Sequence, residues 1–370
     1  MDDPLLMWPD PLSAVLAAIL REDGCGTMEA ACIADHLVDA SCCGHDSHGV
    51  IRIGRYHAGL RSGLFNPDMR PRVVGDLGAL MQFDGGNGMG QWVARQVFEQ
   101  GIARADSAGL AVISLRRAGH IGRVGAYAEM AAQAGLASVI FTNVAGSRLV
   151  APFGTARRAG STAPVTIGVP NRLGDDFILD FATSLVAEGK ALVAAQGGAP
   201  LSDAVLVDSD GRPNRDPASL YGETASQDVP DPRAGPGALR PFGLHKGSGL
   251  MLACELLGGA LTGNGTNGEK DHRFGNGLFA LLIDPERLDD QDMFHREVAD
   301  YLRFVQSAPP AEGVDAVRIP GDRERQMRLL RRTEGLPVAK RVDKVICDIC
   351  EALSIPLPKD LYVDGPASAN

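Results

Sequence analysis

The sequence predicts a mixed α/β protein with a central sheet and a helical region that both chain ends supply. Short apolar runs containing β-branched residues, such as 110–115 and 277–283, alternate with helical patterns through the middle of the chain. Helical periodicity dominates near the two ends, at 11–39 and 323–353. Taken alone, the alternation of strands and helices favours a doubly wound sheet.

Composition sets the class of protein. A chain of 370 residues with 45% hydrophobic content can form two domains or one large one. The net charge of -10 and the isoelectric point near 5.3 argue against a nucleic-acid binder. No apolar run is long enough for a membrane span. The acidic start Met1–Pro4 has no signal-peptide pattern, so we expect a cytoplasmic protein.

The seven cysteines form an odd set without the spacing of a disulfide scaffold, and they are expected to be reduced thiols. Cys347 and Cys350 have the spacing of a redox or zinc pair, yet they lie in an apolar helical pattern and are expected in the core. Residues 42–48 hold two cysteines and two histidines, whose closeness in the chain would strain tetrahedral ligation. We therefore expect no metal.

The N-terminal part predicts helices before the first strand. Two short amphipathic helices are expected within 11–39, followed by an irregular connection at 61–72. Strand 79–84 then leads through the glycines of 85–90 into a helix at 91–108. The glycine spacing is G-x-G-x-G, and no acidic residue ends a second strand, so a turn before a core helix is predicted instead of a dinucleotide-binding loop.

The remaining elements alternate along the chain. Strands are predicted at 110–115, 137–143, 164–169, 177–181 and 277–283, and helices at 124–134, 246–261, 292–307, 323–333 and 338–353. Asp180 can cap a helix that begins at Leu185. Residues 208–243 carry six prolines and no periodicity, which is typical of a lid, an oligomer arm or a disordered segment.

The segment Asp46–Tyr56 brings acidic, basic and hydroxyl groups together. If the chain is helical from Val50, then Arg52, Arg55 and Tyr56 share one face. A guanidinium binds a carboxylate at two points, and an adjacent histidine can move a proton near neutral pH. The segment therefore suits reduction of a 2-oxo acid. The alternative is that the arginines are solvated helix charges and the histidine a capping residue.

Two more segments have functional side chains at the junction of a loop and a helix. Arg116–Gly122 contains His120 and follows a predicted strand, and Phe242–Leu250 opens a helix with glycines and carries a lysine. Such loops and helix N-termini often hold ligands. Asn143 stands at a predicted strand end, where polar groups commonly face a ligand.

These segments resemble the malate/L-lactate dehydrogenase family of nicotinamide-dependent oxidoreductases, which lacks the usual Rossmann domain and also contains ureidoglycolate and sulfolactate dehydrogenases. Seven motifs occur in family order over nearly the whole chain: Ser47–Val50 with Arg52, Gly119–Gly122, Ala151–Gly154, Gly160–Pro164, Asp180–Ser184, Lys246–Leu250 and Ile319–Asp322. The continuation Cys254–Gly263 is most similar to the hydroxycarboxylate dehydrogenase B branch.

The resemblance implies a fold and an activity. It implies a partly antiparallel sheet domain at 76–309 that binds the cofactor, and a helical domain from 1–75 plus 310–370. It also implies a homodimer whose cofactor site lies close to the partner subunit. The expected reaction is hydride transfer between NAD or NADP and C2 of a small 2-oxo or 2-hydroxy acid. No acidic residue at a Rossmann strand end is available to distinguish NAD from NADP.

The resemblance also implies roles for individual residues. His48 and His120 are the two candidates for the proton donor, and Arg52 is expected to bind the substrate carboxylate. Ser47 can orient the first histidine, and Lys246 can contact the substrate oxygen or the nicotinamide ribose. The implied cofactor-binding residues are His120, Asn143, Ser161, Thr162, Pro164, Leu179, Asp180, Phe181, Ala182, Thr183, His245, Lys246 and Gly321.

The chain departs from the family pattern at five positions. The family usually has an aromatic residue at Ile121, a glycine at Thr155 and an asparagine at Ala163, and the charges of Arg116 and Arg117 are added beside the expected site. These departures bear on the substrate more than on the reaction type.

Three alternative functions stay open at this point. The first is reduction of a cyclic imine carboxylate, which the same family includes. A hydrolase built on Ser248 would need a G-x-S-x-G elbow, and the first glycine is missing. A noncatalytic ligand-binding protein would result if the added arginines prevented turnover.

Overall fold

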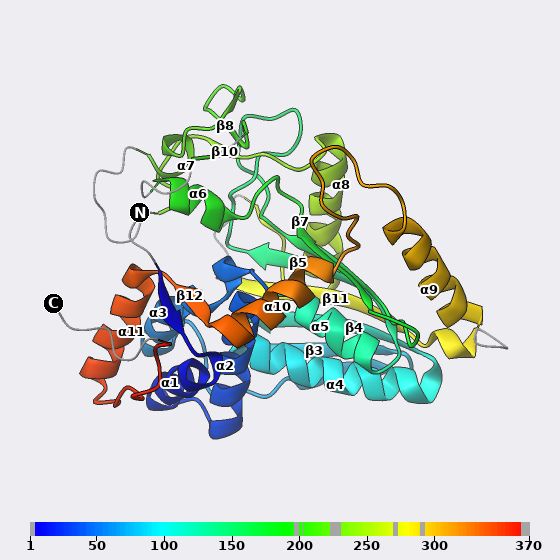
Figure 1. The fold of residues 1–370 in the computed structure, drawn as a ribbon, viewed down its shortest axis with the longest axis horizontal. Helices are drawn as coiled ribbons and strands as arrows, with labels where there is room; N and C mark the ends of the chain where they lie inside the picture. Colours follow the sequence, from blue (N-terminus) through cyan, green and yellow to red (C-terminus); the bar gives the residue numbers. More distant parts are fainter. Residues whose placement is uncertain are drawn as a thin grey trace.

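The computed structural model describes residues 4–195, 200–201, 203–222, 231–268, 273–288 and 293–363. Its centre is one large sheet (Figure 1). The strands of this sheet are β2 (Arg72–Leu77), β3 (Leu80–Gly88), β4 (Leu110–Ala118), β5 (Ala137–Ala145), β6 (Pro164–Val169), β7 (Phe177–Ala182) and β11 (Gly275–Ile283). Their order is β2-β3-β4-β11-β5-β6-β7, and only β3 and β4 are parallel neighbours. The partly antiparallel sheet is confirmed, and the doubly wound arrangement is wrong.

Helices cover both faces of this sheet. They are α4 (Gly90–Ala108) and α5 (Gly125–Gln133) on one face, and α8 (His245–Ala253) with its π-helical continuation η3 (Cys254–Leu261) on the other. Because successive strand residues point to opposite faces, Ile140 of β5 joins the core under α4 and α5, while Phe141 packs against Cys254. The alternation in sequence therefore decides which helix each strand residue meets.

Both chain ends build a second, helical core, as predicted. Its elements are β1 (Leu5–Met7), α1 (Pro9–Glu22), α2 (Thr27–Cys42), α3 (Ile53–Arg61), β12 (Leu336–Val338) and α11 (Lys340–Ala352). Leu16, Leu37 and Ile53 share this core with Leu336 and Ile346 from the other end of the chain. Figure 1 shows these N-terminal and C-terminal elements side by side. The domain boundaries at residues 75 and 310 stay a prediction.

The connecting elements between the two ends are mostly short. The turns η1 (Asp46–His48) and η2 (Val50–Arg52) precede α3, and η4 (Pro285–Arg287) follows β11. Helix α9 (Met293–Gln306) lies apart from the other helices in Figure 1, and α10 (Asp322–Glu334) packs against α2. In the described ranges, none of the helices combines the length and the apolar content that crossing a membrane requires.

A third, smaller core contradicts the expectation of a structureless segment at 208–243. The elements of this core are α6 (Glu188–Ala195), β8 (Leu206–Val207), β9 (Pro213–Asn214), α7 (Ala218–Tyr221) and β10 (Ala238–Leu239), and the last three of them belong to 208–243. The guanidinium of Arg158 donates to the carbonyls of Leu220, Pro232, Gly235 and Gly237. The partly buried side chain of Arg158 thus holds together segments that share few strand hydrogen bonds. The expected segment also includes residues 223–230, which lie outside the described ranges.

Strand β2 and the ends of β3 and β4 differ most from the prediction. Strand β2 was missed because it is a largely exposed edge strand without an alternating pattern of apolar residues. Strand β3 continues through the glycines expected to form a turn, and β4 continues through Arg116 and Arg117 to Ala118. Pairing between Gly88 and Ala118 holds these two ends together. Glycines and arginines are poor local signals for strands, so tertiary pairing decides here.

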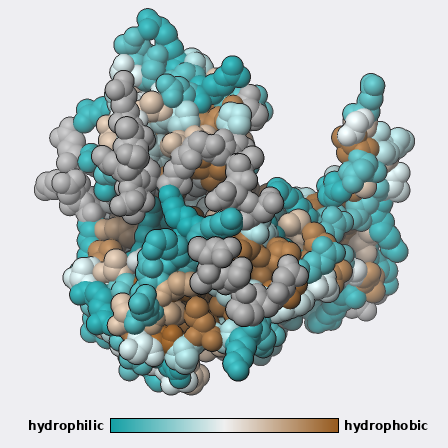
Figure 2. Space-filling view, turned by 60° about the vertical axis from the view of Figure 1, so that its left-hand side comes forward, coloured by the Kyte–Doolittle hydropathy of each residue, from teal (hydrophilic) through white to brown (hydrophobic). Residues whose placement is uncertain are grey.

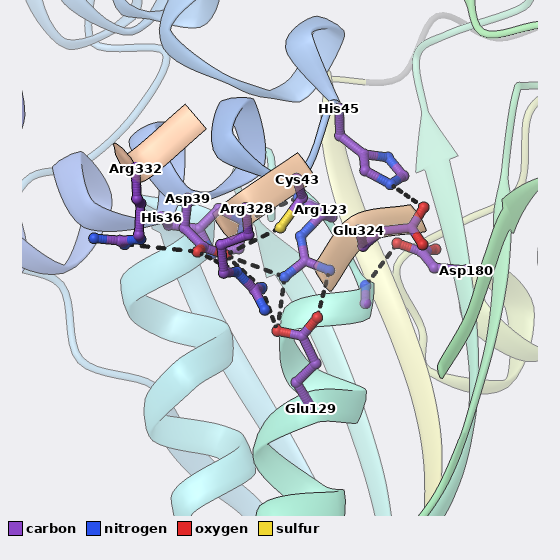
Figure 3. A network of polar contacts seen from close by, with 11 residues as sticks. His36, Asp39, Cys43, His45, Arg123, Glu129, Asp180, Glu324, Arg328 and Arg332 are labelled. Carbon is purple, nitrogen blue, oxygen red and sulfur yellow. Dashed lines mark hydrogen bonds and ion pairs between the residues drawn. The ribbon is translucent and has the colours of Figure 1, made fainter. Parts of the chain in front are cut away.

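A buried ion network joins the helical region to the sheet (Figure 3). The guanidinium of Arg123, whose side chain is 2% exposed, donates to both oxygens of Glu129 in α5 at 3.0 and 2.9 Å and to Asp39 in α2 at 3.2 Å. Arg328 of α10 donates to the same two carboxylates at 2.8 to 2.9 Å. Helices α2, α5 and α10 therefore meet at one set of paired charges.

We expect Arg123→Met to lower the free energy of unfolding by about 2 to 3 kcal/mol, because two partly buried carboxylates lose a partner and only Arg328 remains to neutralise them. Urea denaturation measures this loss. The matched control is Arg95→Met, which breaks a half-exposed pair with Glu99 and should cost less than about 0.5 kcal/mol. Equal losses in the two variants would contradict a stabilising role for the network.

Candidate active site

A cleft of about 1420 Å³ lies between the helical region, the large sheet and the third core. One wall is the segment Asp46–Arg52, called here the η1–η2 segment. The opposite wall includes residues 119–123, called here the His120 loop, together with β6 and β7. Helix α6 and residues 231–233 close the third side. Side chains far apart in the sequence therefore face one space.

The η1–η2 segment fixes a serine, a histidine and an arginine relative to one another. The Ser47 hydroxyl lies 2.9 Å from Nδ1 of His48, and Nε of Arg52 donates to the Ser47 carbonyl. Gly49 is required at the centre of the segment, because a Cβ there would lie 1.9 Å from the hydroxyl oxygen of Ser41. The close approach to α2 thus sets the position of both flanking side chains.

The predicted single face of Arg52, Arg55 and Tyr56 is wrong. The chain forms a 3-10 turn up to Arg52 before α3 begins, and this changes the angle between the side chains. Arg55 is exposed at the cleft, whereas Tyr56 is only 3% exposed and points into the protein. The two arginines remain on the cleft, and the tyrosine supports it from behind.

The His120 loop is held by backbone hydrogen bonds on both sides of the histidine. The Gly119 amide donates to the carbonyl of Gly88 at 2.9 Å, and the Ile121 amide donates to the side chain of Asn276 at 3.0 Å. A Cβ on Gly90 would lie 2.3 Å from the His120 carbonyl oxygen, so only glycine fits there. The glycines of 85–90 therefore allow β3 and α4 to touch the loop that presents His120.

The rings of His48 and His120 lie against each other in the cleft. Their centroids are 5.5 Å apart and their planes differ by 21°. The Phe274 ring also stacks with His120, with their centroids 6.4 Å apart. The Tyr56 hydroxyl lies 2.7 Å from Nδ1 of His120, and Nε2 of Gln91 donates to that hydroxyl at 2.6 Å. Each imidazole thus has its Nδ1 occupied by a hydroxyl.

Burial controls the charges of this site. It lowers the pKa of His48 to about 3 and that of His120 well below its usual value, and the positive charge of Arg52 lowers both further. Burial, with the nearby charge of Arg55, also lowers the pKa of Arg52. The site therefore combines two neutral imidazoles with one desolvated guanidinium, and a bound anion would relieve the cost of burying that cation.

Comparison with known proteins agrees with this geometry. The family model for malate/L-lactate dehydrogenase matches residues 8–346. The chain belongs to the malate/L-lactate dehydrogenase family. Both the family and the fold predicted from the seven motifs are confirmed.

Several family members are similar over most of their length. An L-lactate dehydrogenase of Cupriavidus necator is 36% identical over 88% of this chain and 91% of its own. A hydroxycarboxylate dehydrogenase B of Escherichia coli O157:H7 is 32% identical over 93% of both chains. The sulfolactate dehydrogenase structure from Methanocaldococcus jannaschii has a TM-score of 0.82 at 30% identity, over 95% of this chain and 98% of its own. A Delta(1)-pyrroline-2-carboxylate/Delta(1)-piperideine-2-carboxylate reductase of Pseudomonas putida is more distant, at 29% identity over 89% of this chain and 92% of its own.

The structure brings part of the expected family site together. Besides Ser47, His48, Arg52 and His120, the residues on the cleft are Thr162, Pro164, Asp180, Phe181 and Ala182. Asp180 was predicted to cap a helix that begins at Leu185. This is wrong, because the next helix, α6, begins only at Glu188. Its carboxylate instead accepts from the Gly125 amide at 2.7 Å and from the Thr166 hydroxyl at 2.8 Å. It caps α5 directly behind the His120 loop.

Other expected cofactor residues do not line the cleft. Asn143 and Ser161 are fully buried and donate to the carboxylate of Glu255 in η3. The Thr183 hydroxyl donates to the Ala163 carbonyl at 2.7 Å. The remaining residues of this group, which lie on neighbouring elements outside the cleft lining, are Leu179, His245, Lys246 and Gly321. Cofactor contacts through these residues stay a prediction.

The two arginines that depart from the family pattern are neutralised away from the cleft. Arg116 and Arg117 both donate to the carboxylate of Asp84, whose side chain is 2% exposed. Neither arginine lines the cleft. Contrary to expectation, they add no charge to the site, and the reason is a strand pairing that places Asp84 opposite Arg116.

Two residues of the site were missed. Gln91 lies on the buried stripe of α4 that also holds Ala94 and Phe98, so a polar residue in an apolar stripe was the available signal. Glu188 is on the cleft and accepts from the Tyr221 hydroxyl at 2.8 Å. It comes from α6, whose place beside the η1–η2 segment has no local sequence signal.

The residues considered for a metal point in different directions. Cys43 contacts Asp39, His45 contacts Glu324, and His48 faces Ser47. Over the described ranges, no group of three histidine, cysteine or acidic side chains could hold a metal ion.

We expect the free energy of unfolding to fall as the pH drops from about 7.5 to about 4.5. Burial lowers the pKa of His36 to about 4, and it lowers the pKa of His48 and His120 as well. Below about pH 6.5 the histidines bind protons in the unfolded chain but not in the folded protein. His36 alone should lower the free energy of unfolding by about 2 to 3 kcal/mol at pH 4.5. Urea unfolding at the two pH values measures the loss. His36→Gln should flatten the dependence, and equal stability of the unchanged protein at both pH values would contradict it.

Proposed function

We propose that the protein transfers a hydride between a nicotinamide cofactor and C2 of a small 2-oxo acid, or in reverse from a 2-hydroxy acid. One observation carries the proposal: Arg52 is a partly buried cation on the cleft that makes no ion pair with any described residue, and it lies beside two neutral imidazoles. Family membership supports the reaction type, and the names of the relatives support a hydroxy acid as the substrate class.

The cleft fits a dinucleotide together with a substrate. Its volume exceeds the range of about 300 to 1,000 Å³ that is typical for one drug-sized ligand. The hydroxyl of Thr142 lines the cleft, is buried and finds no hydrogen-bond partner among the described residues. Thr162, Asp180 and Ala182 are the residues best placed to hold the cofactor, which can be NAD or NADP and supplies the hydride when bound.

The substrate groups match the side chains on the other wall. The guanidinium of Arg52 binds the carboxylate, and its Nε bond to Ser47 fixes the plane in which the remaining nitrogens donate. His48 and His120, whose rings lie against each other on the cleft, would hydrogen-bond the oxygen at C2 and exchange a proton with it. The carboxylate and the reacting oxygen are thus held at two separate points, which orients C2.

Reduction of a cyclic imine carboxylate is the second candidate. The similarity to a pyrroline-2-carboxylate and piperideine-2-carboxylate reductase favours it, and such substrates also carry a carboxylate next to the reacting carbon. A panel of 2-oxo acids and cyclic imine carboxylates, with absorbance of NADH and NADPH as the readout, decides between the two. Cofactor binding without turnover on the whole panel would support the noncatalytic alternative.

We expect Arg52→Met to lower kcat/KM for the preferred oxo acid by about 30-fold to several thousand-fold, because truncating one partner of a desolvated charge pair costs roughly 2 to 5 kcal/mol. Lysine should restore only part of this loss. Arg116→Met is the matched control, since that arginine pairs with Asp84 outside the cleft. If the mutant still distinguishes the acid from its amide as strongly as the unchanged enzyme does, another residue binds the carboxylate.

We also propose a homodimer in the cytoplasm. The apolar side chains of Leu252 and Leu256, one helical turn apart on α8 and η3, are 51% and 61% exposed, and such rows favour contact with a second copy. Met293 and Phe304 of α9 are also exposed, and Figure 2 shows an arm with apolar patches that stands out from the body.

All seven cysteines are unpaired, which supports a reducing compartment.

Light scattering after gel filtration should give twice the 38.9 kDa of one chain. The double change Leu252→Glu with Leu256→Glu should shift the protein toward monomers, because it places two charges in an apolar contact. Leu77→Glu, at a side chain that is 76% exposed on β2, is the control and should not change the mass. A monomer at micromolar concentration would contradict the proposed dimer.

A further inference from the structure

A chain of two buried polar side chains lies behind His120. Tyr56 of α3 and Gln91 of α4 are 3% and 1% exposed. The amide Nε2 of Gln91 is 2.6 Å from the Tyr56 oxygen, and this oxygen is 2.7 Å from Nδ1 of His120. The chain ends at the cleft, because His120 is part of its lining.

The chemistry of the groups gives this chain a direction. An amide nitrogen can only donate, so the Tyr56 oxygen is the acceptor of the Gln91 bond. The single hydrogen of Tyr56 then goes to its other neighbour, Nδ1 of His120, which must accept. A neutral imidazole has one hydrogen, and here that hydrogen lies on Nε2.

We propose that Gln91 and Tyr56 form a relay that fixes His120 with its proton on Nε2, and that the Tyr56 hydroxyl supplies the proton that His120 passes to the substrate oxygen. This inference rests on the proposed function, and it assigns the proton transfer to His120 where the sequence left both histidines open. His48 then remains beside it as a neutral hydrogen-bonding group oriented by Ser47.

The proton transfer balances in both directions. During reduction the cofactor, when bound, would supply a hydride to C2, which would leave the oxygen at C2 as an alkoxide that needs a proton. The Nε2–H bond of His120 breaks as the new O–H bond forms, and Nδ1 takes the hydroxyl proton of Tyr56. The resulting phenolate is stabilised by the amide of Gln91, and it regains its proton from Nδ1 of His120 when Nε2 takes up a proton from water in the cleft. Oxidation of the hydroxy acid runs through the same steps in reverse.

A relay is needed because the surroundings of His120 disfavour a positive charge. The ring is partly buried at the cleft, and its charged or titratable neighbours are Arg52, Arg55, His48 and His36. Burial raises the pKa of Tyr56 to about 12, while Arg52 and the Gln91 bond act in the opposite direction. A phenol remains a stronger acid than an alcohol, so transfer from Tyr56 to the alkoxide is favourable without an imidazolium.

The decisive variant is Tyr56→Phe, assayed as reduction of the oxo acid with saturating cofactor. We expect kcat to fall by about two to four decades while KM changes much less, since the relay acts in the proton transfer. The kcat of the unchanged enzyme should stay level between about pH 6 and 9, because no imidazolium is required. The residual kcat of Tyr56→Phe should rise as the pH falls, because only a protonated ring can then donate.

The controls separate the relay from packing. Tyr362→Phe removes a hydroxyl that donates to Asp343 at 2.8 Å on α11, and Gln96→Met changes a part-buried glutamine of α4 that donates to the Trp92 carbonyl at 3.2 Å. Both should leave kcat and its pH profile unchanged. Gln91→Met should lower kcat about tenfold, because Tyr56 keeps its bond to His120 but loses the donor that stabilises its phenolate. Thermal unfolding shows whether each variant is folded. If Tyr56→Phe does not fold, the kcat of Gln91→Met tests the relay instead.

The ¹⁵N NMR shifts of the His120 ring give a readout without turnover. We expect the pattern of a neutral ring protonated on Nε2, and Tyr56→Phe should alter it. Three results would each overturn the relay. The first is a His120 ring protonated on Nδ1, and the second is a kcat of Tyr56→Phe within threefold of that of the unchanged enzyme. The third is a kcat of the unchanged enzyme that falls as the pH rises through neutrality. If the unchanged enzyme reduces nothing in the substrate panel, the proposed function fails, whereas the NMR shifts still decide the tautomer.

Discussion

The rest of the site depends on the ion network around Arg123. Its side chain ties Asp39 of α2 to Glu129 of α5, and its backbone amide donates to Nε2 of His36 at 2.9 Å (Figure 3). The side chain thus joins two cores, and the backbone positions the loop that carries His120. Because burying a cation is favourable only when carboxylates pair with it, the network constrains the angle between the helical region and the sheet. That angle decides whether the two imidazoles meet.

On the sheet side, the close approach of backbone segments also positions the His120 loop. Gly88 pairs with the end of β4, and Gly90 leaves room for the His120 carbonyl. Both glycines belong to the run 85–90, whose composition is similar to that of a phosphate-binding loop. Their actual use is to let one strand and one helix touch the His120 loop without side chains between them. A loop held by its backbone on both sides needs little reorganisation when a ligand binds.

How much the sequence could predict depended on whether the signal was local. Strand β6 and the start of β4 were predicted from apolar runs, and the seven motifs identified the family correctly. The edge strand β2, the short elements around Arg158 and the η3 π-helix have no local pattern that distinguishes them. Arg116 shows the limit most clearly, because its ion pair with Asp84 arises only from the register of two parallel strands.

The arrangement of charges explains how such a site can bind an anion and still handle protons at neutral pH. Arg52 lowers the pKa of both neighbouring histidines, so the group that would hold the carboxylate also keeps the imidazoles neutral. A site that relied on an imidazolium would have to place a second positive charge beside a desolvated guanidinium, at a cost that burial increases. Hydrogen bonds from neutral hydroxyl and amide groups avoid this conflict. In the proposed relay, Tyr56 and Gln91 would let His120 transfer a proton without adding a second positive charge beside Arg52.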